Sequence, residues 1–251
     1  MSTKHRTLPA LEEDYQVLSD TVREFADEVV APVSAELDAQ HEFPYEIVAQ
    51  MGEMGLFGLP FPEEYGGMGG DYFALALALE QLGRVNQSVA ITLEAGVSLG
   101  AMPLLKFGTE EQKQRWLPGL ASGELVGAIA MTEPNTGSDL QAVRTRATRD
   151  GDHYVINGSK TFISNATHCG LLLIVARTGD EPGGRGLSLI VAETDGLEGF
   201  ERGRVLKKIG QHGQDIIALE LALDMDRQAL AAVLVDHGKH AEGLAVMGAI
   251  H

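Results

Sequence analysis

The chain has 251 residues, of which 44% are hydrophobic and 22% charged, a composition typical of a soluble globular protein. Its formal net charge of −17 argues against non-specific nucleic-acid binding, which needs a positive surface. The single cysteine, Cys169, excludes an intramolecular disulfide and favours a reducing compartment, so a cytoplasmic protein is expected. Because no signal-peptide pattern opens the chain and its apolar runs are far shorter than the roughly 20 residues of a membrane helix, we expect no membrane span.

The first half of the chain has the apolar spacing of amphipathic helices. Apolar residues three and four positions apart predict a helix over 15–29, and Pro32 either ends it or starts its frayed last turn. Pro44 suits the first turn of a second helix, and PEEYGGMGG, 62–70, is predicted as a loop. Spacing and capping residues predict further helices at about 71–82, 87–106 and 109–118. Residues 1–125 are therefore assigned to a helical N-terminal domain.

After about residue 125 the apolar period changes to two, which indicates β-strands. Turn sequences such as RDGD and NGS separate the apolar runs. The predicted strands are 126–132, 145–149, 153–157, 161–164, 171–177, 187–193 and 216–223. Short strands at this spacing form a small barrel or sandwich, so residues 126–224 are assigned to a middle β domain. The predicted fold class is thus α+β. A divergent tail, 225–251, follows; its pattern is ambiguous, and a helix over 227–235 is one interpretation of it.

Two polar segments interrupt the strands of the β domain. TEPNTGSDL, 132–140, is either a tight solvated turn or a cradle whose backbone N–H groups and hydroxyls hold a polar ligand. In NGSKTFISN, 157–165, Phe162 either joins the core, the commoner outcome, or faces a planar ligand. Neither a phosphate-binding loop of the nucleotide hydrolases nor a GxGxxG motif is present, so a Rossmann nicotinamide site is not expected.

Few residues in the sequence are spaced as metal ligands or as a catalytic nucleophile with its partners. His237 and His240 are three residues apart, but Gly238 disfavours a helix between them and no carboxylate or cysteine pattern supports them. We therefore expect a solvated pair and no metal. Cys169 heads an apolar run and is expected to pack in the core, and His212 is expected in a loop.

Five stretches of the sequence, taken together, resemble the acyl-CoA dehydrogenase family. They are PEEYGGMGGDY (62–72), KFGTEEQKQRWLPGLASGE (106–124), AMTEPNTGSDL (130–140), NGSKTFISNA (157–166) and KIGQHGQD (208–215). The resemblance covers about residues 10–217 and looks most like the long-chain branch. It implies a helical N-terminal domain, a middle β domain and a C-terminal helical domain. The last of these is absent here, so we expect a chain shortened at its C-terminus.

The resemblance implies an FAD cofactor that lies between the β domain and the C-terminal domain. The family segment matched by 129–132 runs past the flavin ring, and the Thr132 hydroxyl reaches the ring's polar edge. The segment matched by 162–164 lies against the flavin, and Ser138 contacts both the cofactor region and the pantetheine arm of the CoA thioester. The implied cofactor-binding residues are Ile129, Ala130, Met131, Thr132, Gly137, Ser138, Phe162, Ile163 and Ser164, and Ser138 is also the implied substrate-binding residue.

The family reaction is the α,β-dehydrogenation of an acyl-CoA thioester to the trans-2-enoyl-CoA, a step of fatty acid β-oxidation. A glutamate removes the α-proton, the β-hydride passes to the flavin, and an electron-transfer flavoprotein then takes the electrons. The resemblance therefore implies an oxidoreductase with an acyl-CoA substrate, an electron-transfer flavoprotein as partner and a homo-oligomeric assembly.

The sequence departs from the family after GQD, and both family positions for the catalytic glutamate lie beyond His251. Glu133 and Glu220 are the nearest candidates by sequence, but neither stands where the family has its base. We therefore assign no catalytic residue. Two alternatives to a catalyst stay open: a non-catalytic binding or assembly module, or a fragment that pairs with a full-length homologue.

Overall fold

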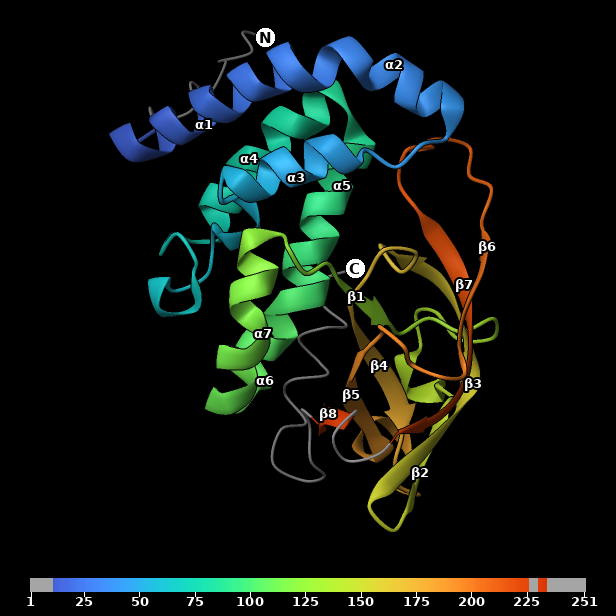
Figure 1. The fold of residues 1–251 in the computed structure, drawn as a ribbon. Helices are drawn as coiled ribbons and strands as arrows, with labels where there is room; N and C mark the ends of the chain where they lie inside the picture. Colours follow the sequence, from blue (N-terminus) through green and yellow to red (C-terminus); the bar gives the residue numbers. More distant parts are fainter. Residues whose placement is uncertain (1–10, 226–229, 234–251) are drawn as a thin grey trace, which may run out of the picture.

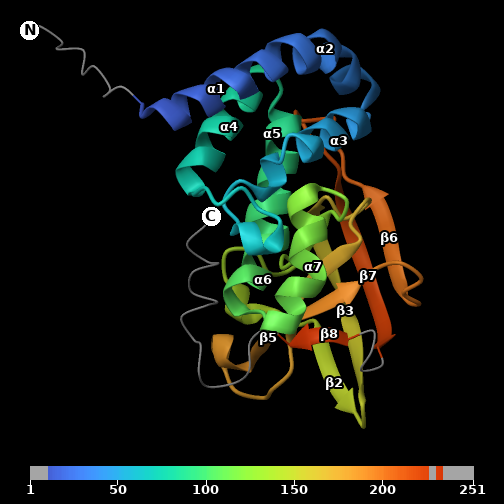
Figure 2. The same cartoon turned by 60° about the vertical axis from the view of Figure 1, so that its left-hand side comes forward.

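The computed structural model describes residues 11–225 and 230–233. In this part of the chain a helical domain comes first and a curled mixed sheet follows it, with the helices stacked on one side of the sheet (Figures 1 and 2). The predicted fold class, α+β with helices before strands, is confirmed.

The helical domain consists of α-helices joined by turns and by two π-helical segments. Its helices are α1 Glu13–Phe25, η1 Ala26–Val30, α2 Ala31–Gln40, α3 Tyr45–Glu53, α4 Tyr72–Val85, α5 Gln87–Glu94, η4 Ala95–Ala101, α6 Met102–Phe107 and α7 Glu110–Ser122. Short 3-10 turns are η2 Leu56–Gly58, η3 Glu63–Tyr65, η5 Leu140–Ala142 and η6 Gly183–Gly186. The side chains of Asp71, Asn86 and Thr109 accept the N-terminal hydrogen bonds of α4, α5 and α7.

The first helix neither ends at Pro32 nor frays there, which corrects the sequence-based prediction. The chain widens into the π-helical turn η1 and then continues as α2 to Gln40. Pro32 stands in the first turn of α2, where a residue without an N–H is tolerated. The helix ends only at His41, which has a left-handed backbone with φ of 57°.

A long apolar helix from Gln87 to Phe107 forms the centre of the helical domain. It has 21 residues, and its most apolar window has a mean hydropathy of 1.5, enough in length and composition to cross a membrane. That window is 72% buried inside the protein, which is the pattern of a core helix. Its middle turn, η4, packs directly on the first strand, because a Cβ added at Gly100 would lie 2.6 Å from the carbonyl carbon of Gly127.

The sheet has strand order β6-β7-β3-β2-β4-β5-β8, and β1 pairs in parallel with β4. The strands are β1 Gly127–Ala130, β2 Arg146–Asp150, β3 His153–Ser164, β4 Leu171–Arg177, β5 Leu187–Glu193, β6 Phe200–Val205, β7 Ile216–Met225 and β8 Leu230–Val233. Strand β4 is buried on both faces: its alternate residues pack against the helices and into the curled sheet.

Three sequence-based assignments in the β domain were wrong. The sequence NGS is not a turn, because 153–157 and 161–164 form one strand, β3, that pairs with β7 along its length. Strand β6 was missed, because its sequence FERGRV is mostly exposed and lacks apolar alternation. The helix predicted over 227–235 is replaced at Leu230–Val233 by β8, where pairing with β5 overrides local propensity. The rest of that predicted helix, like His237 and His240, lies outside the described residues.

Candidate functional site

A small pocket lies where the helical domain meets the sheet. Its volume is about 110 Å³. It is lined by Ala95 and Leu99 from η4, by Ala128, Ile129, Met131 and Thr132 from β1 and the residues after it, and by Phe162, Ile163 and Ser164 from the end of β3. The close contact between Gly100 and Gly127 holds η4 against β1, two of the elements that line this pocket. The pocket thus joins the two polar segments that the sequence singled out.

A β-bulge in β3 turns Phe162 toward this pocket. Lys160 pairs with Leu219 and Ile163 with Ile217, so β3 has one more residue than β7 over this interval. Phe162 adopts a positive φ of 59° and is 65% exposed, whereas Lys160 and Ile163 are both buried. The expectation that Phe162 joins the core was therefore wrong, because the bulge turns its side chain out of the sheet.

The loop after β1 is closed by hydrogen bonds of its own backbone. Glu133 and Thr136 exchange hydrogen bonds, with the Glu133 N–H 2.8 Å from the Thr136 carbonyl and the Thr136 N–H 3.0 Å from that of Glu133. The Thr136 hydroxyl donates to the carbonyl of Ala142 at 3.1 Å. Gly137 and Ser138 lie exposed at the tip, and a Cβ at Gly137 would meet open space. The loop is a tight turn in its own bonding, and its tip is exposed.

The structure separates the nine residues that the sequence grouped as cofactor contacts. Six of them line the pocket: Ile129, Met131, Thr132, Phe162, Ile163 and Ser164. Ala130 is fully buried and packs in the core inside the curled sheet. Gly137 and Ser138 stand on the exposed loop tip and do not line this pocket.

A buried ion pair stands beside the pocket. The Lys160 ammonium lies 3.0 Å from Oε1 of Glu133, and the two side chains are 0% and 6% exposed. Burial lowers the pKa of Lys160 to about 8, although the hydrogen bond and charge of Glu133 oppose that shift. Burial also disfavours ionised Glu133, but hydrogen bonds from Thr145, Arg144 and Lys160 outweigh it and leave the pKa of Glu133 lowered.

Neither Glu133 nor Glu220, the two acids that the sequence offered as nearest candidates for a base, has the setting of a proton acceptor. Both oxygens of Glu133 already accept hydrogen bonds inside the protein. Glu220 is exposed on β7 and accepts a hydrogen bond of 2.6 Å from the Ser159 hydroxyl. Among the described residues no group of three or more His, Cys, Asp or Glu side chains could hold a metal ion.

Sequence reasoning missed several residues of the site. Ala95 and Leu99 read as ordinary core positions of an apolar helix, and only the tertiary fold brings them to the pocket. Lys160 could have been found from the sequence, because a lysine inside an otherwise apolar strand is buried only with a hydrogen-bonding or charged partner. The Asp215 carboxylate accepts N–H bonds from Asn165 at 3.0 Å and Thr167 at 2.7 Å, which fixes the turn after β3.

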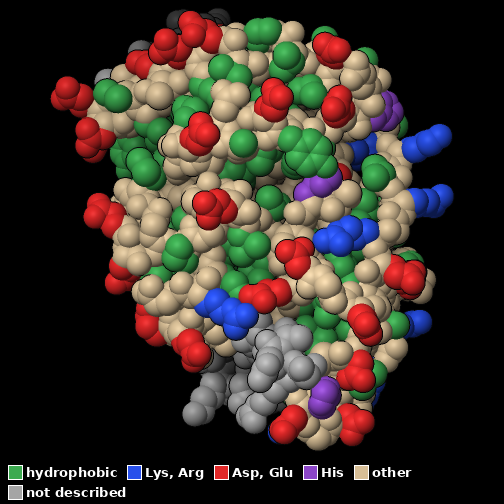
Figure 3. All heavy atoms as spheres, in the orientation of Figure 1, with side chains coloured by type: hydrophobic (Ala, Val, Ile, Leu, Met, Phe, Trp, Pro, Cys, Tyr) green, Lys and Arg blue, Asp and Glu red, His purple; other side chains and the backbone are tan. Residues whose placement is uncertain are grey.

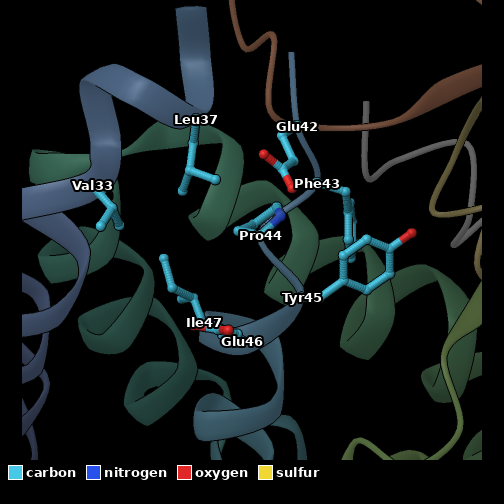
Figure 4. A pocket seen from close by; sticks show the side chains of 8 residues that line it. All are labelled: Val33, Leu37, Glu42, Phe43, Pro44, Tyr45, Glu46 and Ile47. Carbon is cyan, nitrogen blue, oxygen red and sulfur yellow. The ribbon is translucent and has the colours of Figure 1, made fainter. Parts of the chain in front are cut away.

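Two other pockets lie in the described part of the chain. One, of about 330 Å³, lies between α2 and α3, where Val33 and Leu37 of α2 lie opposite Pro44 and Ile47 (Figure 4). The other, of about 440 Å³, is lined mainly by acidic residues near the turn after β5. Acidic side chains also spread over the helical domain in Figure 3, as the net charge requires. Neither pocket contains a residue that the sequence assigned to cofactor or substrate.

Comparison with known proteins decides the family. Residues 12–124 match the acyl-CoA dehydrogenase N-terminal domain, and residues 128–225 match the middle domain of the same enzymes. The chain belongs to the acyl-CoA dehydrogenase family. A probable acyl-CoA dehydrogenase of Bacillus subtilis is 41% identical over 230 residues, which are 91% of this chain and 60% of that relative.

Solved structures of the acyl-CoA dehydrogenase family have the same fold. Butyryl-CoA dehydrogenase from Megasphaera elsdenii superposes with a TM-score of 0.88 at 33% identity, over 96% of this chain and 63% of that one. An acyl-CoA dehydrogenase from Bacillus anthracis, solved in complex with FAD, gives a TM-score of 0.82 at 32% identity, over 94% of this chain and 40% of that one. The chain thus spans less than two thirds of the length of each of these relatives.

Proposed function

We propose that the pocket between η4, the end of β1 and the β3 bulge is one wall of an FAD and acyl-CoA site, in an oxidoreductase that dehydrogenates an acyl-CoA thioester to the trans-2-enoyl-CoA. The observation that carries this proposal is the convergence of six of the nine implied cofactor residues on one pocket. Those six come from segments about 30 residues apart in the sequence, and the bulge leaves the Phe162 ring exposed instead of packing it in the core.

The chemistry of the lining fits a planar ring with a polar edge. Ile129, Met131 and Ile163 offer an apolar surface, and the exposed ring of Phe162 offers an aromatic face. The half-buried hydroxyls of Thr132 and Ser164 stand at the margin of this surface, as hydrogen-bonding groups for a ring's heteroatoms. FAD, when bound, supplies the two-electron acceptor, and this chain's residues hold and orient it.

We assign the exposed loop tip to the substrate. Gly137 and Ser138 stand exposed in the loop that follows Thr132, so the Ser138 hydroxyl is available to the pantetheine arm of a CoA thioester. On the other side of the pocket, Ala95 and Leu99 would exclude water from the acyl chain.

No described residue is proposed as the catalytic base. Because the chain covers only part of its relatives, the base is proposed to stand in a segment that corresponds to the remainder of the family fold. The whole enzyme is proposed to act in the cytoplasm as a homo-oligomer that delivers its electrons to an electron-transfer flavoprotein. Residues 1–125, 126–224 and 225–251 are proposed as its helical domain, β domain and divergent tail.

A second candidate function is a non-catalytic module that pairs with a full-length relative. The exposed apolar side chains near the same end of the sheet favour it: besides Phe162, Val205 is 57% exposed and Ile209 is fully exposed in the loop after β6. Such side chains are typical of a surface that another protein segment covers.

Anaerobic reduction tests the proposed enzyme, and size-exclusion chromatography tests the module. The protein, reconstituted with FAD, is mixed with butyryl-CoA or with palmitoyl-CoA, and the visible absorbance of the flavin is followed. A flavin that binds and is bleached by either thioester supports the enzyme. Absence of FAD uptake rejects the enzyme role for this pocket. A complex with a full-length relative in size-exclusion chromatography supports the module, and a lone monomer in that mixture rejects it.

A further inference from the structure

The buried pair of Glu133 and Lys160 joins the two walls of the candidate flavin site. Lys160 is 1% exposed and uses all three of its donors. They reach the Met131 carbonyl at 3.0 Å, Oε1 of Glu133 at 3.0 Å and the Val175 carbonyl at 2.7 Å. One ammonium therefore ties the end of β1 and strand β4 to the residue of β3 that directly precedes the bulge.

The carboxylate of Glu133 closes the loop from the inside. Its Oε2 accepts the Arg144 N–H at 2.8 Å, and its Oε1 accepts the Thr145 N–H at 2.9 Å. The loop from 133 to 145 thus begins and ends at one buried carboxylate, with its tip free. A further backbone hydrogen bond of 2.9 Å, from the Thr161 N–H to the Thr132 carbonyl, joins the two walls beside the pair.

Stability alone gives a weak reason for this arrangement. Burial of two charges is costly, and well-packed apolar side chains of similar volume stabilise a fold about as well or better. What apolar side chains cannot do is hold three separate carbonyl and carboxylate groups at fixed directions. The pair therefore determines where the Met131–Thr132 backbone and the Phe162 bulge stand relative to each other.

We propose that Glu133 and Lys160 are positioning residues, which set the affinity of the site for flavin by fixing the segment 131–132 and the bulge 161–163 against each other. Neither side chain lines the pocket, so both act through the residues that do. The inference rests on the proposed function, because it takes the ligand of the pocket to be the flavin ring of FAD.

The double variant Glu133→Leu/Lys160→Met separates positioning from stability. Because the charges are removed together, the double variant leaves no unpaired charge buried. The Arg144 and Thr145 N–H groups and the Met131 and Val175 carbonyls lose these partners, so the double variant is expected to unfold at a lower urea concentration than the wild type. Where it is still folded, we expect it to bind FAD about tenfold more weakly, whereas a variant destabilised elsewhere in the same domain is expected to keep wild-type affinity. The visible absorption and circular dichroism of any bound flavin are expected to shift, since the ring loses its fixed partners.

Single variants and a matched control complete the test. Glu133→Gln keeps the shape of the side chain and is expected to speed amide hydrogen exchange at Arg144 and Thr145 in the ligand-free protein. The control Ile190→Val loosens the same domain's core without touching the pair, and is expected to leave FAD affinity and the flavin spectrum unchanged.

The outcomes distinguish this inference from the proposed function. A wild-type chain that takes up no FAD contradicts the proposed function, and the exchange rates at Arg144, Thr145 and Thr161 then decide the positioning role alone. Faster exchange confined to 131–145 and 160–164 in Glu133→Gln supports positioning. A folded double variant with wild-type FAD affinity, or a Glu133→Gln variant with wild-type exchange at these amides, overturns it.

Discussion

At the scale of single residues, burial decides which reactive groups can take part in chemistry. Cys169, Glu133 and Lys160 each carry a side chain that reacts or titrates readily when exposed, and each is at least nine-tenths buried. Cys169 packs in the core, and Glu133 and Lys160 form a buried ion pair with each other. The exposed Phe162 is the opposite case, an apolar ring kept in solvent by its backbone.

Cys169 is predicted to resist thiol reagents in the folded protein. Its thiol is 1% exposed, and burial raises its pKa to about 12, so thiolate is scarce at neutral pH. With Ellman's reagent at pH 8, we expect no release of chromophore from the native protein over an hour and one equivalent per chain after unfolding in guanidinium. Rapid stoichiometric release from the native protein would contradict the packing described for this residue.

Lys160 is predicted to make stability depend on alkaline pH. Its pKa falls from 10.5 in the unfolded chain to about 8 in the folded one, so between these values the unfolded chain binds more protons. The free energy of unfolding therefore rises with pH in this window, by about 2 kcal/mol between pH 7.5 and 9.5 from this group.

Urea unfolding of the wild type and of Lys160→Met at both pH values measures this contribution. The rise should be larger in the wild type than in the variant by roughly that amount, because other titrating groups are common to both proteins. Equal pH dependence in the two proteins would mean that Lys160 titrates normally.

At the scale of elements, the sequence predicted correctly those helices and strands whose determinants lie within the element itself. Helices α4, α5 and α7 carry their caps at Asp71, Asn86 and Thr109, and their starts were predicted closely. The end predicted for α7 was wrong, because this helix continues through Pro118 to Ser122. Strand β6 and the join within β3 depend on partners far away in the sequence, so local pattern failed there. The bulge at Phe162 depends on the register with β7, which no local pattern contains, whereas the family resemblance already pointed to the segment.

The contact between η4 and β1 is predicted to tolerate no added methyl group. In Gly100→Ala the new Cβ would stand 2.6 Å from the Gly127 backbone, so the helix must move away from the strand. We expect a loss of about 2 kcal/mol in the free energy of unfolding.

Gly83→Ala is the matched control for this contact. Gly83 also lies within a helix, α4, but its added Cβ would meet only the Cβ of Ala90 at 3.6 Å. Replacement there should be neutral or stabilising by up to about 1 kcal/mol, since alanine favours the helix. Similar losses for both variants in chemical unfolding would show that helix propensity, not the close approach, controls the effect.

At the scale of the whole molecule, a few polar contacts tie the helical domain to the sheet. The Glu193 carboxylate at the end of β5 accepts the Trp116 indole N–H at 2.7 Å and two hydrogen bonds of 3.1 Å from Arg115 of α7. Together with the Gly100–Gly127 contact, these bonds hold the helices and the sheet around the pocket. The site therefore exists only while both domains are folded together.

Trp116, the single tryptophan, is predicted to report this coupling. In the wild type, urea unfolding followed by tryptophan fluorescence and by far-ultraviolet circular dichroism should coincide. Glu193→Ala removes three hydrogen bonds at the domain junction and should lower the free energy of unfolding by about 1–3 kcal/mol. The control Asp180→Ala breaks an ion pair whose acid is 90% exposed, and should change it by less than about 0.5 kcal/mol. Wild-type stability in Glu193→Ala would mean that the junction does not depend on this carboxylate.

The most direct test of the flavin site is an FAD titration of Phe162→Ala beside the wild type. Phe162 is exposed and contributes little to the fold, so its replacement should leave urea unfolding nearly unchanged while it removes the aromatic face of the pocket. Tyr72→Ala, which removes an exposed aromatic ring from the helical domain, is the control. We predict that the wild type and Tyr72→Ala quench FAD fluorescence with equal affinity, and that Phe162→Ala binds about tenfold more weakly. Equal FAD affinity in all three proteins would contradict the assignment of this pocket to the flavin.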